Sequence, residues 1–254
     1  MRDGLRALLW IGILTTGAVI LWRASLSLSA KAPFPIDHGE RLAFGVTVTG
    51  IVAGLSCAMS YARPRLITWS PLDRRTFSQT ASGAAAYAAL AIPATATLAW
   101  IGLTDIGLTR SSETALTLAY LLLLVLLSEA LPEELLFRGW IMQALEKDRS
   151  PWKPVLGQAL VFSLFAWVVG AVSSVTDASF IACFGIVLGI VRAVTGTIWT
   201  SVGLHLAFIT AQQSALPSWA IWGGDPHPPV QIIGLTILPF SIIVGILYGR
   251  VKPS

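Results

Sequence analysis

The stretch Ala115–Leu127 reads ALTLAYLLLLVLL, and residues 128–140 continue it as SEALPEELLFRGW. The first part has the composition of a transmembrane helix. The second part carries the carboxylates of Glu129, Glu133 and Glu134 and the guanidinium of Arg138. A charge in the middle of a bilayer costs several kcal/mol. These four side chains must therefore face protein or a water-filled cavity rather than lipid.

The composition of the whole chain excludes a water-facing globular domain. Of 254 residues, 55% are apolar and only 12% are charged, whereas a soluble domain carries about a quarter charged residues. The net charge of +4 does not indicate nucleic acid, because the Lys and Arg residues lie at the ends of apolar runs and form no basic stripe. Cys57 and Cys183 both lie inside apolar runs, so no disulfide framework is indicated.

The apolar runs predict an all-α, polytopic transmembrane helical bundle of about eight helices. The predicted helices are Leu5–Arg23, Leu42–Tyr61, Ala81–Leu103, Thr114–Leu145, Pro154–Val172, Phe180–Val194, Thr197–Gln213 and Gln231–Gly249. The sixth and seventh are short, so they form a tight hairpin or one of them is a partial span. The first is either a signal peptide or an uncleaved helix, and Leu28 at a position that favours a small residue supports the helix.

The same pattern divides the chain into N-terminal helices over residues 1–113, a core over 114–213, and a loop with a last helix over 214–254. With an even number of helices, both termini lie on one side of the membrane. That side would hold twelve basic residues: Arg2, Arg6, Arg63, Arg65, Arg74, Arg75, Lys147, Arg149, Lys153, Arg192, Arg250 and Lys252. The other side would hold four: Arg23, Lys31, Arg41 and Arg110. Positive residues accumulate in the cytoplasm, so we expect a multi-pass protein of the cell membrane with both termini cytoplasmic.

Helix geometry predicts different roles for the charges of the fourth helix. Glu134 and Arg138 are four residues apart, so they share a face and can form an ion pair. Glu133 points about 100° away, with Glu129 above it on the same face. Pro132 removes a helix hydrogen bond and favours a kink. We therefore expect one paired carboxylate and one that faces a cavity, although an interfacial salt bridge would also fit these residues.

His205 is the histidine that lies inside an apolar helix. Counted from the predicted cytoplasmic ends of their helices, His205 and Phe162 lie at a similar depth, which predicts a polar cavity in that half of the bilayer. Such a cavity suits hydrolysis, because a carboxylate can take a proton from water and an imidazole can hold the water or stabilise an oxyanion. Glu133 and His205 alone are too few ligands for a catalytic metal, so no cofactor is firmly implied and a divalent metal is only weakly supported. A structural hydrogen bond between helices is the alternative for His205.

These residues resemble the CAAX prenyl endopeptidase and bacteriocin-processing (CPBP, or Abi) family of intramembrane proteases. Residues 133–139, EELLFRG, match the family's EExxxR motif, and the segment 195–205, with TG, W and GLH, resembles the approach to its HxxxN or HxxxD motif. The resemblance covers roughly residues 114–213. It implies that Glu133 activates water, that Glu134 and Arg138 support it, and that His205 helps to bind the water or the oxyanion. It also implies a peptide or a lipidated protein as substrate.

Two positions depart from the family pattern. Ala166 stands where the FxxxH motif has a histidine, and Ile209 stands where Asn or Asp is expected. Candidate auxiliary residues are Glu129, Phe162 and Gln212, the last of which lies on nearly the same face as His205 and would replace the missing amide. His227 lies in the loop Leu216–Pro229, on the predicted outer side, so we do not expect it to reach the site.

Three functions fit this sequence. The main prediction is an intramembrane endopeptidase that acts near the cytoplasmic leaflet. The loss of the two motif residues favours a weak or inactive pseudoprotease that serves as a binding or immunity protein. Membrane carboxylates also serve proton relays, but the chain has no internal repeat of the kind that transporters show. We expect membrane lipid as a partner, and we do not expect nucleic acid.

Overall fold

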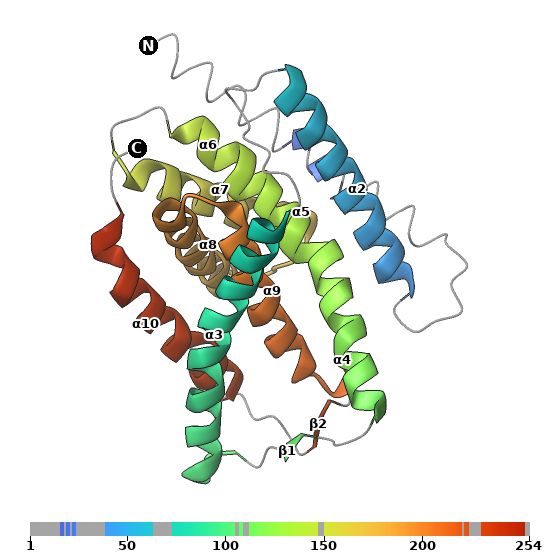
Figure 1. Ribbon diagram of the computed structural model, residues 1–254, viewed down its shortest axis with the longest axis vertical. Coiled ribbons are helices and arrows are strands. Elements are labelled where there is room, and N and C mark those ends of the chain that lie inside the picture. Colours follow the sequence, from blue (N-terminus) through green and yellow to red (C-terminus); the bar gives the residue numbers. More distant parts are fainter. Residues whose placement is uncertain are drawn as a thin grey trace.

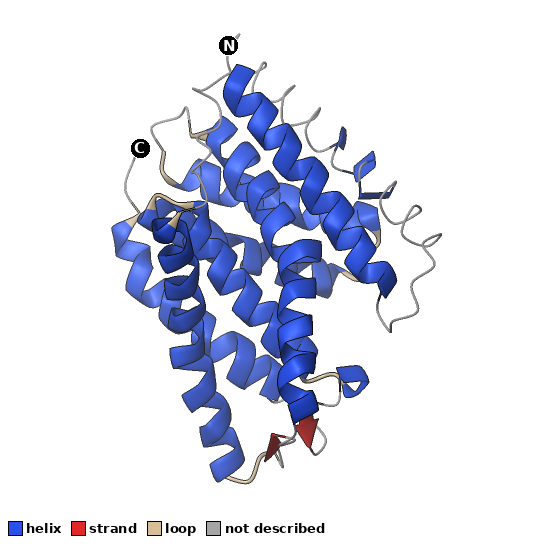
Figure 2. Ribbon diagram, turned by 45° about the vertical axis from the view of Figure 1, so that its right-hand side comes forward, coloured by secondary structure: helices blue, strands red, loops and turns tan. Residues whose placement is uncertain are grey.

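The computed structural model is a bundle of helices (Figures 1 and 2). It describes residues 16–17, 19–20, 22–23, 39–62, 73–104, 107–108, 112–146, 150–219, 221–223 and 230–251. Within these residues six helices are long and apolar enough to cross a membrane, which confirms the predicted all-α membrane bundle. The predicted first helix lies mostly outside the described residues, so the predicted number of eight is not tested there.

Long helices account for most of the described chain. They are α2 (Gly39–Ala62), α3 (Arg74–Trp100), a long helix over residues 112–145, α7 (Trp152–Val169), α8 (Val175–Thr195), α9 (Ile198–Ser214), and a last helix over residues 230–250. Two short strands, β1 (Gly107–Leu108) and β2 (Trp222–Gly223), pair antiparallel at the opposite end of the bundle from Met142–Leu145 (α6 in Figure 1). A single-turn 3-10 helix, η3 (Pro217–Trp219), precedes β2.

Two helices begin earlier than the hydrophobic pattern predicts, because polar residues cap them. The side chain of Asp73 accepts a hydrogen bond from the backbone N–H of Thr76 at 2.8 Å, so α3 begins at Arg74 rather than Ala81. The hydroxyl of Ser174 likewise accepts from Asp177 at 3.0 Å and starts α8 at Val175. The sixth predicted helix is therefore long enough to span and is not a partial one.

The long helix is not a regular α-helix around Pro132. It consists of α4 (Ser112–Val125), the π-helix η1 (Leu126–Ala130), α5 (Leu131–Glu133), the π-helix η2 (Glu134–Ile141) and α6. Pro132 lies between the two π-helices. A π-helix bonds each N–H to the carbonyl five residues earlier, and such segments are frequent at functional sites. The last helix has a similar start, with η4 (Val230–Ile237) followed by α10 (Leu238–Leu247) and η5 (Tyr248–Arg250).

The helix α9 lies inside the bundle and contacts α3, α4, α8, η1, η2 and η4. Its contact with α3 is very close. A Cβ on Gly203 would collide with the backbone oxygen of Thr80, and a Cβ on Gly83 would collide with that of Thr200. Small residues allow this approach between membrane helices. The turn before α9 contains Gly196 in the left-handed conformation, with φ of 70°. This packing fixes the helix that carries His205.

Candidate active site

The π-helix η2 places Glu134 and Arg138 on one side, as the sequence predicts. The Nη1 atom of Arg138 lies 3.0 Å from Oε1 of Glu134, and both side chains are 0% exposed. A buried ion pair that loses one partner leaves an uncompensated charge in an apolar surrounding. The predicted pair is therefore present, and it belongs to the interior of the protein.

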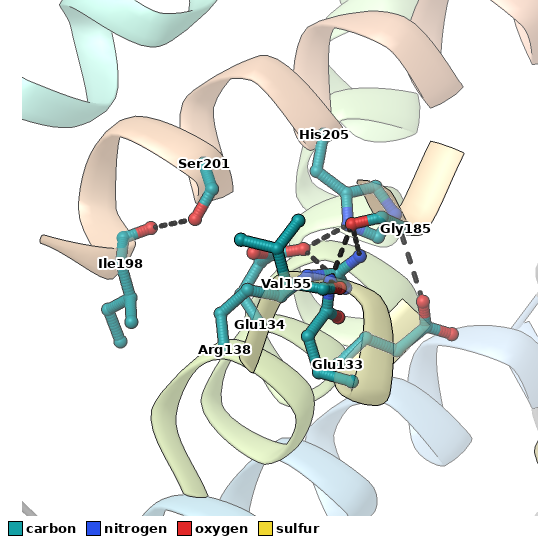
Figure 3. A network of polar contacts seen from close by, with 9 residues as sticks. Glu133, Glu134, Arg138, Val155, Gly185, Ile198, Ser201 and His205 are labelled. Atoms are coloured by element: carbon teal, nitrogen blue, oxygen red, sulfur yellow. Dashed lines mark hydrogen bonds and ion pairs between the residues drawn. The ribbon is translucent and has the colours of Figure 1, made fainter. Parts of the chain in front are cut away.

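His205 on α9 contacts both glutamates, one through each ring nitrogen (Figure 3). Its Nδ1 atom lies 2.9 Å from Oε1 of Glu134. Its Nε2 atom lies 3.8 Å from Oε2 of Glu133, which is too long for a direct hydrogen bond. A carboxylate in an ion pair is an acceptor, so a neutral imidazole here would carry its proton on Nδ1 and its lone pair on Nε2, the nitrogen nearer Glu133.

The two carboxylates differ in exposure. The Glu134 side chain is 0% exposed, whereas that of Glu133 is 15% exposed and that of His205 only 1%. The predicted ion pair of Glu134 is present, and Glu133 is the more exposed of the two carboxylates. That Glu133 faces a cavity stays a prediction. Both carboxylates reach the imidazole of His205, Glu134 at Nδ1 and Glu133 at Nε2.

Aromatic side chains cover the Arg138 end of this network and one side of His205. The Cζ atom of Arg138 lies 4.7 Å from the centre of the Phe162 ring, so the predicted auxiliary Phe162 does join the site. The Phe184 ring meets His205 edge to face at 4.9 Å between ring centres, and it stacks on Phe240. These three phenylalanines are buried.

The comparisons with known proteins agree with this constellation. Residues 115–211 match the family model described as Type II CAAX prenyl endopeptidase Rce1-like. This segment belongs to the Rce1-like family. No curated protein matches the chain. The match confirms the resemblance inferred from the motifs, and over this segment it supports a CAAX-type intramembrane protease, a hydrolase, at family level.

The Rce1-like segment runs from α4 to α9 and therefore holds Glu133, Glu134, Arg138 and His205. It also holds the two departures from the motifs. Ala166 is buried in α7, one turn beyond Phe162, and Ile209 is half-buried one turn beyond His205. His227 lies outside the described residues.

Two predicted auxiliary residues form their contacts with side chains and carbonyls other than those of the Glu133, Glu134, Arg138 and His205 network. Glu129 forms an ion pair with Arg41 of α2, and its Oε1 also accepts from Nε2 of Gln213 at 3.0 Å. The amide nitrogen of Gln212 donates to the carbonyl of Gln231 at 3.0 Å and to the hydroxyl of Thr236 at 2.8 Å. These contacts attach neighbouring helices to α9. Neither Glu129 nor Gln212 shares a hydrogen bond or ion pair with His205 among the described contacts.

Sequence reasoning missed Gln158, which lies beside Arg138 in the Rce1-like segment. Its Nε2 atom donates to the carbonyl of Gly185 at 2.7 Å, and Nη2 of Arg138 lies 3.4 Å from the same oxygen. The signal was a single amide in an apolar run, residues 154–162. As to metals, the described part of the chain has no group of three or more His, Cys, Asp or Glu residues placed to hold an ion.

Proposed function

We propose that the protein is an intramembrane endopeptidase in which Glu133 activates the water that attacks a peptide bond. The observation that supports this is the 3.8 Å separation between Oε2 of Glu133 and Nε2 of His205. A water molecule could bridge these atoms with its oxygen about 2.8 Å from each, to one side of the line that joins them. It would donate one hydrogen to each acceptor and keep a lone pair for the substrate carbonyl.

The reaction then needs no other base. The Glu133 carboxylate takes a proton as the water oxygen bonds to the carbonyl carbon, and the tetrahedral intermediate collapses when that proton passes to the leaving amine. Glu134 and Arg138 act through His205, because their ion pair holds Nδ1 protonated and fixes the ring. The substrate would be a peptide or a lipidated protein, in keeping with the family.

The same helices support a proposal for the position of the site in the membrane. Glu146, at the end of the long helix, lies 3.5 Å from Arg192 near the end of α8, so these two ends are adjacent. Arg192 is itself one of the basic residues that the sequence predicts on the cytoplasmic side. We therefore propose that both termini are cytoplasmic and that cleavage occurs near the cytoplasmic leaflet. Reporter fusions to the C-terminus test the orientation.

The decisive experiment is a cleavage assay with purified protein in liposomes, using fluorogenic peptides with and without a C-terminal prenyl group. Glu133→Gln keeps the size of the side chain and removes the base, so we expect kcat to fall by about 100-fold or more. The matched control is Glu146→Gln, which makes the same change in the pair with Arg192 and leaves kcat unchanged. Equal rates for wild type and Glu133→Gln would remove Glu133 from catalysis.

A second function, a pseudoprotease that binds a membrane partner, is favoured by Ala166 and Ile209. Both positions lie one turn beyond a residue of the site, and neither side chain can exchange a proton. In this case the wild-type protein would cleave none of the peptides, whereas photo-crosslinking from Glu133 or its neighbours would still capture a membrane ligand.

A further inference from the structure

Gln158 is a fully buried amide on α7 with a specific set of partners. Its side chain is 0% exposed, and its Nε2 atom donates to the carbonyls of Gly185 at 2.7 Å and of Val155 at 2.9 Å. Burying an amide costs free energy unless it is hydrogen-bonded. A leucine at this position would avoid that cost, so packing alone does not explain the amide.

Two glycines of α8 make room for this contact. A Cβ on Gly185 would lie 3.0 Å from Cα of Ala159, and a Cβ on Gly189 would lie 2.5 Å from Nε2 of Gln158. Glycines four residues apart let membrane helices approach closely. As a result the Gly185 carbonyl, although part of a helix, is within reach of side chains from two other segments.

The second of these side chains is Arg138. Its Nη2 atom lies 3.4 Å from the Gly185 oxygen, its Cζ atom lies 4.7 Å from the Phe162 ring, and its Nη1 atom pairs with Glu134. Its Nε atom has no hydrogen-bond partner among the described residues. The guanidinium is thus held by few contacts for a fully buried charge, and its position depends on where each of them lies.

We propose that Gln158 is a positioning residue for the active site. It fixes the Gly185 carbonyl, which with Phe162 restrains Arg138. Arg138 in turn holds Glu134, and Glu134 holds Nδ1 of His205. The effect of Gln158 on catalysis rests on the proposed function. Its effect on the orientation of His205 can be measured whether or not the protein cleaves peptides. Without the amide, the carbonyl and the guanidinium shift, and the imidazole no longer keeps one orientation.

The test compares Gln158→Met with Ser163→Ala. Met has the length of Gln but no hydrogen-bond donor. Ser163 also lies on α7 and donates to a carbonyl of α8, that of Ala178 at 2.6 Å, so its loss controls for a weakened contact between the same two helices. The first measurement is the side-chain ¹⁵N NMR spectrum of labelled histidines in detergent. The chain has three histidines, and His205→Asn identifies the His205 signals by their absence.

We expect a single Nδ1-protonated form of His205 in the wild type and in Ser163→Ala, and shifted or exchange-broadened His205 signals in Gln158→Met. In the cleavage assay, kcat of Gln158→Met falls by about tenfold with KM within about twofold, because substrate binding is intact and alignment is lost. If Gln158→Met does not fold, Gly189→Ala gives the same readout by displacing the amide. Unchanged His205 signals in these variants would overturn the proposal. Shifted His205 signals in Gln158→Met, together with no cleavage by the wild-type protein, would support the positioning role of Gln158 and reject the proposed function instead.

Discussion

Nδ1 of His205 lies 2.9 Å from Oε1 of Glu134, and the two side chains are 1% and 0% exposed. The same oxygen lies 3.0 Å from Nη1 of Arg138. Glu134 therefore joins the helix with the EExxxR motif to the helix with the histidine. It lies behind the imidazole, on the side away from Glu133, so its first effect is on the structure of the site.

This arrangement predicts that Glu134→Gln destabilises the protein. The substitution leaves the buried Arg138 charge without a counter-ion, which lowers the free energy of unfolding by about 3–5 kcal/mol. Thermal unfolding in detergent measures the change. Glu133→Gln is the matched control, because Glu133 is partly exposed and its substitution leaves Arg138 paired. Similar melting temperatures for the two variants would contradict the assignment.

Glu129→Gln is expected to retain cleavage activity. Glu129 pairs with Arg41 and Gln213, and the ion pair is 28–30% exposed. Such pairs contribute about 1 kcal/mol or less, so the variant should unfold at nearly the wild-type temperature. The measurement is kcat of Glu129→Gln, compared with kcat of Glu133→Gln under the same conditions. A comparable fall in kcat for both variants would return Glu129 to the reacting groups.

Ala166→His combined with Ile209→Asn tests whether the site is complete. If the missing polar residues limit the rate, this double variant cleaves at least about tenfold faster than wild type, since a positioned proton-transfer group contributes about 100-fold or more. The added volume at buried Ala166 destabilises by about 1–3 kcal/mol, so unfolding is measured in parallel. Adding Glu133→Gln should abolish the gain. A folded double variant with no gain would favour the pseudoprotease.

The sequence was informative where chemistry follows from local spacing. The membrane bundle follows from apolar run length, and the Glu134–Arg138 pair follows from residues four apart. The π-helices around Pro132 did not, because a change in helical hydrogen bonding leaves no clear mark on a hydrophobic pattern.

The sequence also did not predict the roles of residues whose partners lie far away in the chain. Glu129 and Gln212 both looked available to the site, but Arg41 and Thr236, which bind them, come from other helices. Gln158 was missed because its partner is a backbone carbonyl, and the sequence does not show which carbonyls are accessible. Only the packing of α7 against α8 reveals it.

Gly203→Ala tests why a glycine precedes the histidine by two residues. A Cβ at Gly203 would collide with the backbone of Thr80 on α3, and a backbone cannot move aside as a side chain can. The helices must separate, which costs about 1–3 kcal/mol of stability or more and displaces His205. Gly54→Ala is the control, because a Cβ there meets nothing within 4 Å and alanine favours the helix. We expect a lower melting temperature and reduced kcat for Gly203→Ala, and neither for Gly54→Ala. Wild-type stability of Gly203→Ala would mean that α3 and α9 are not in backbone contact.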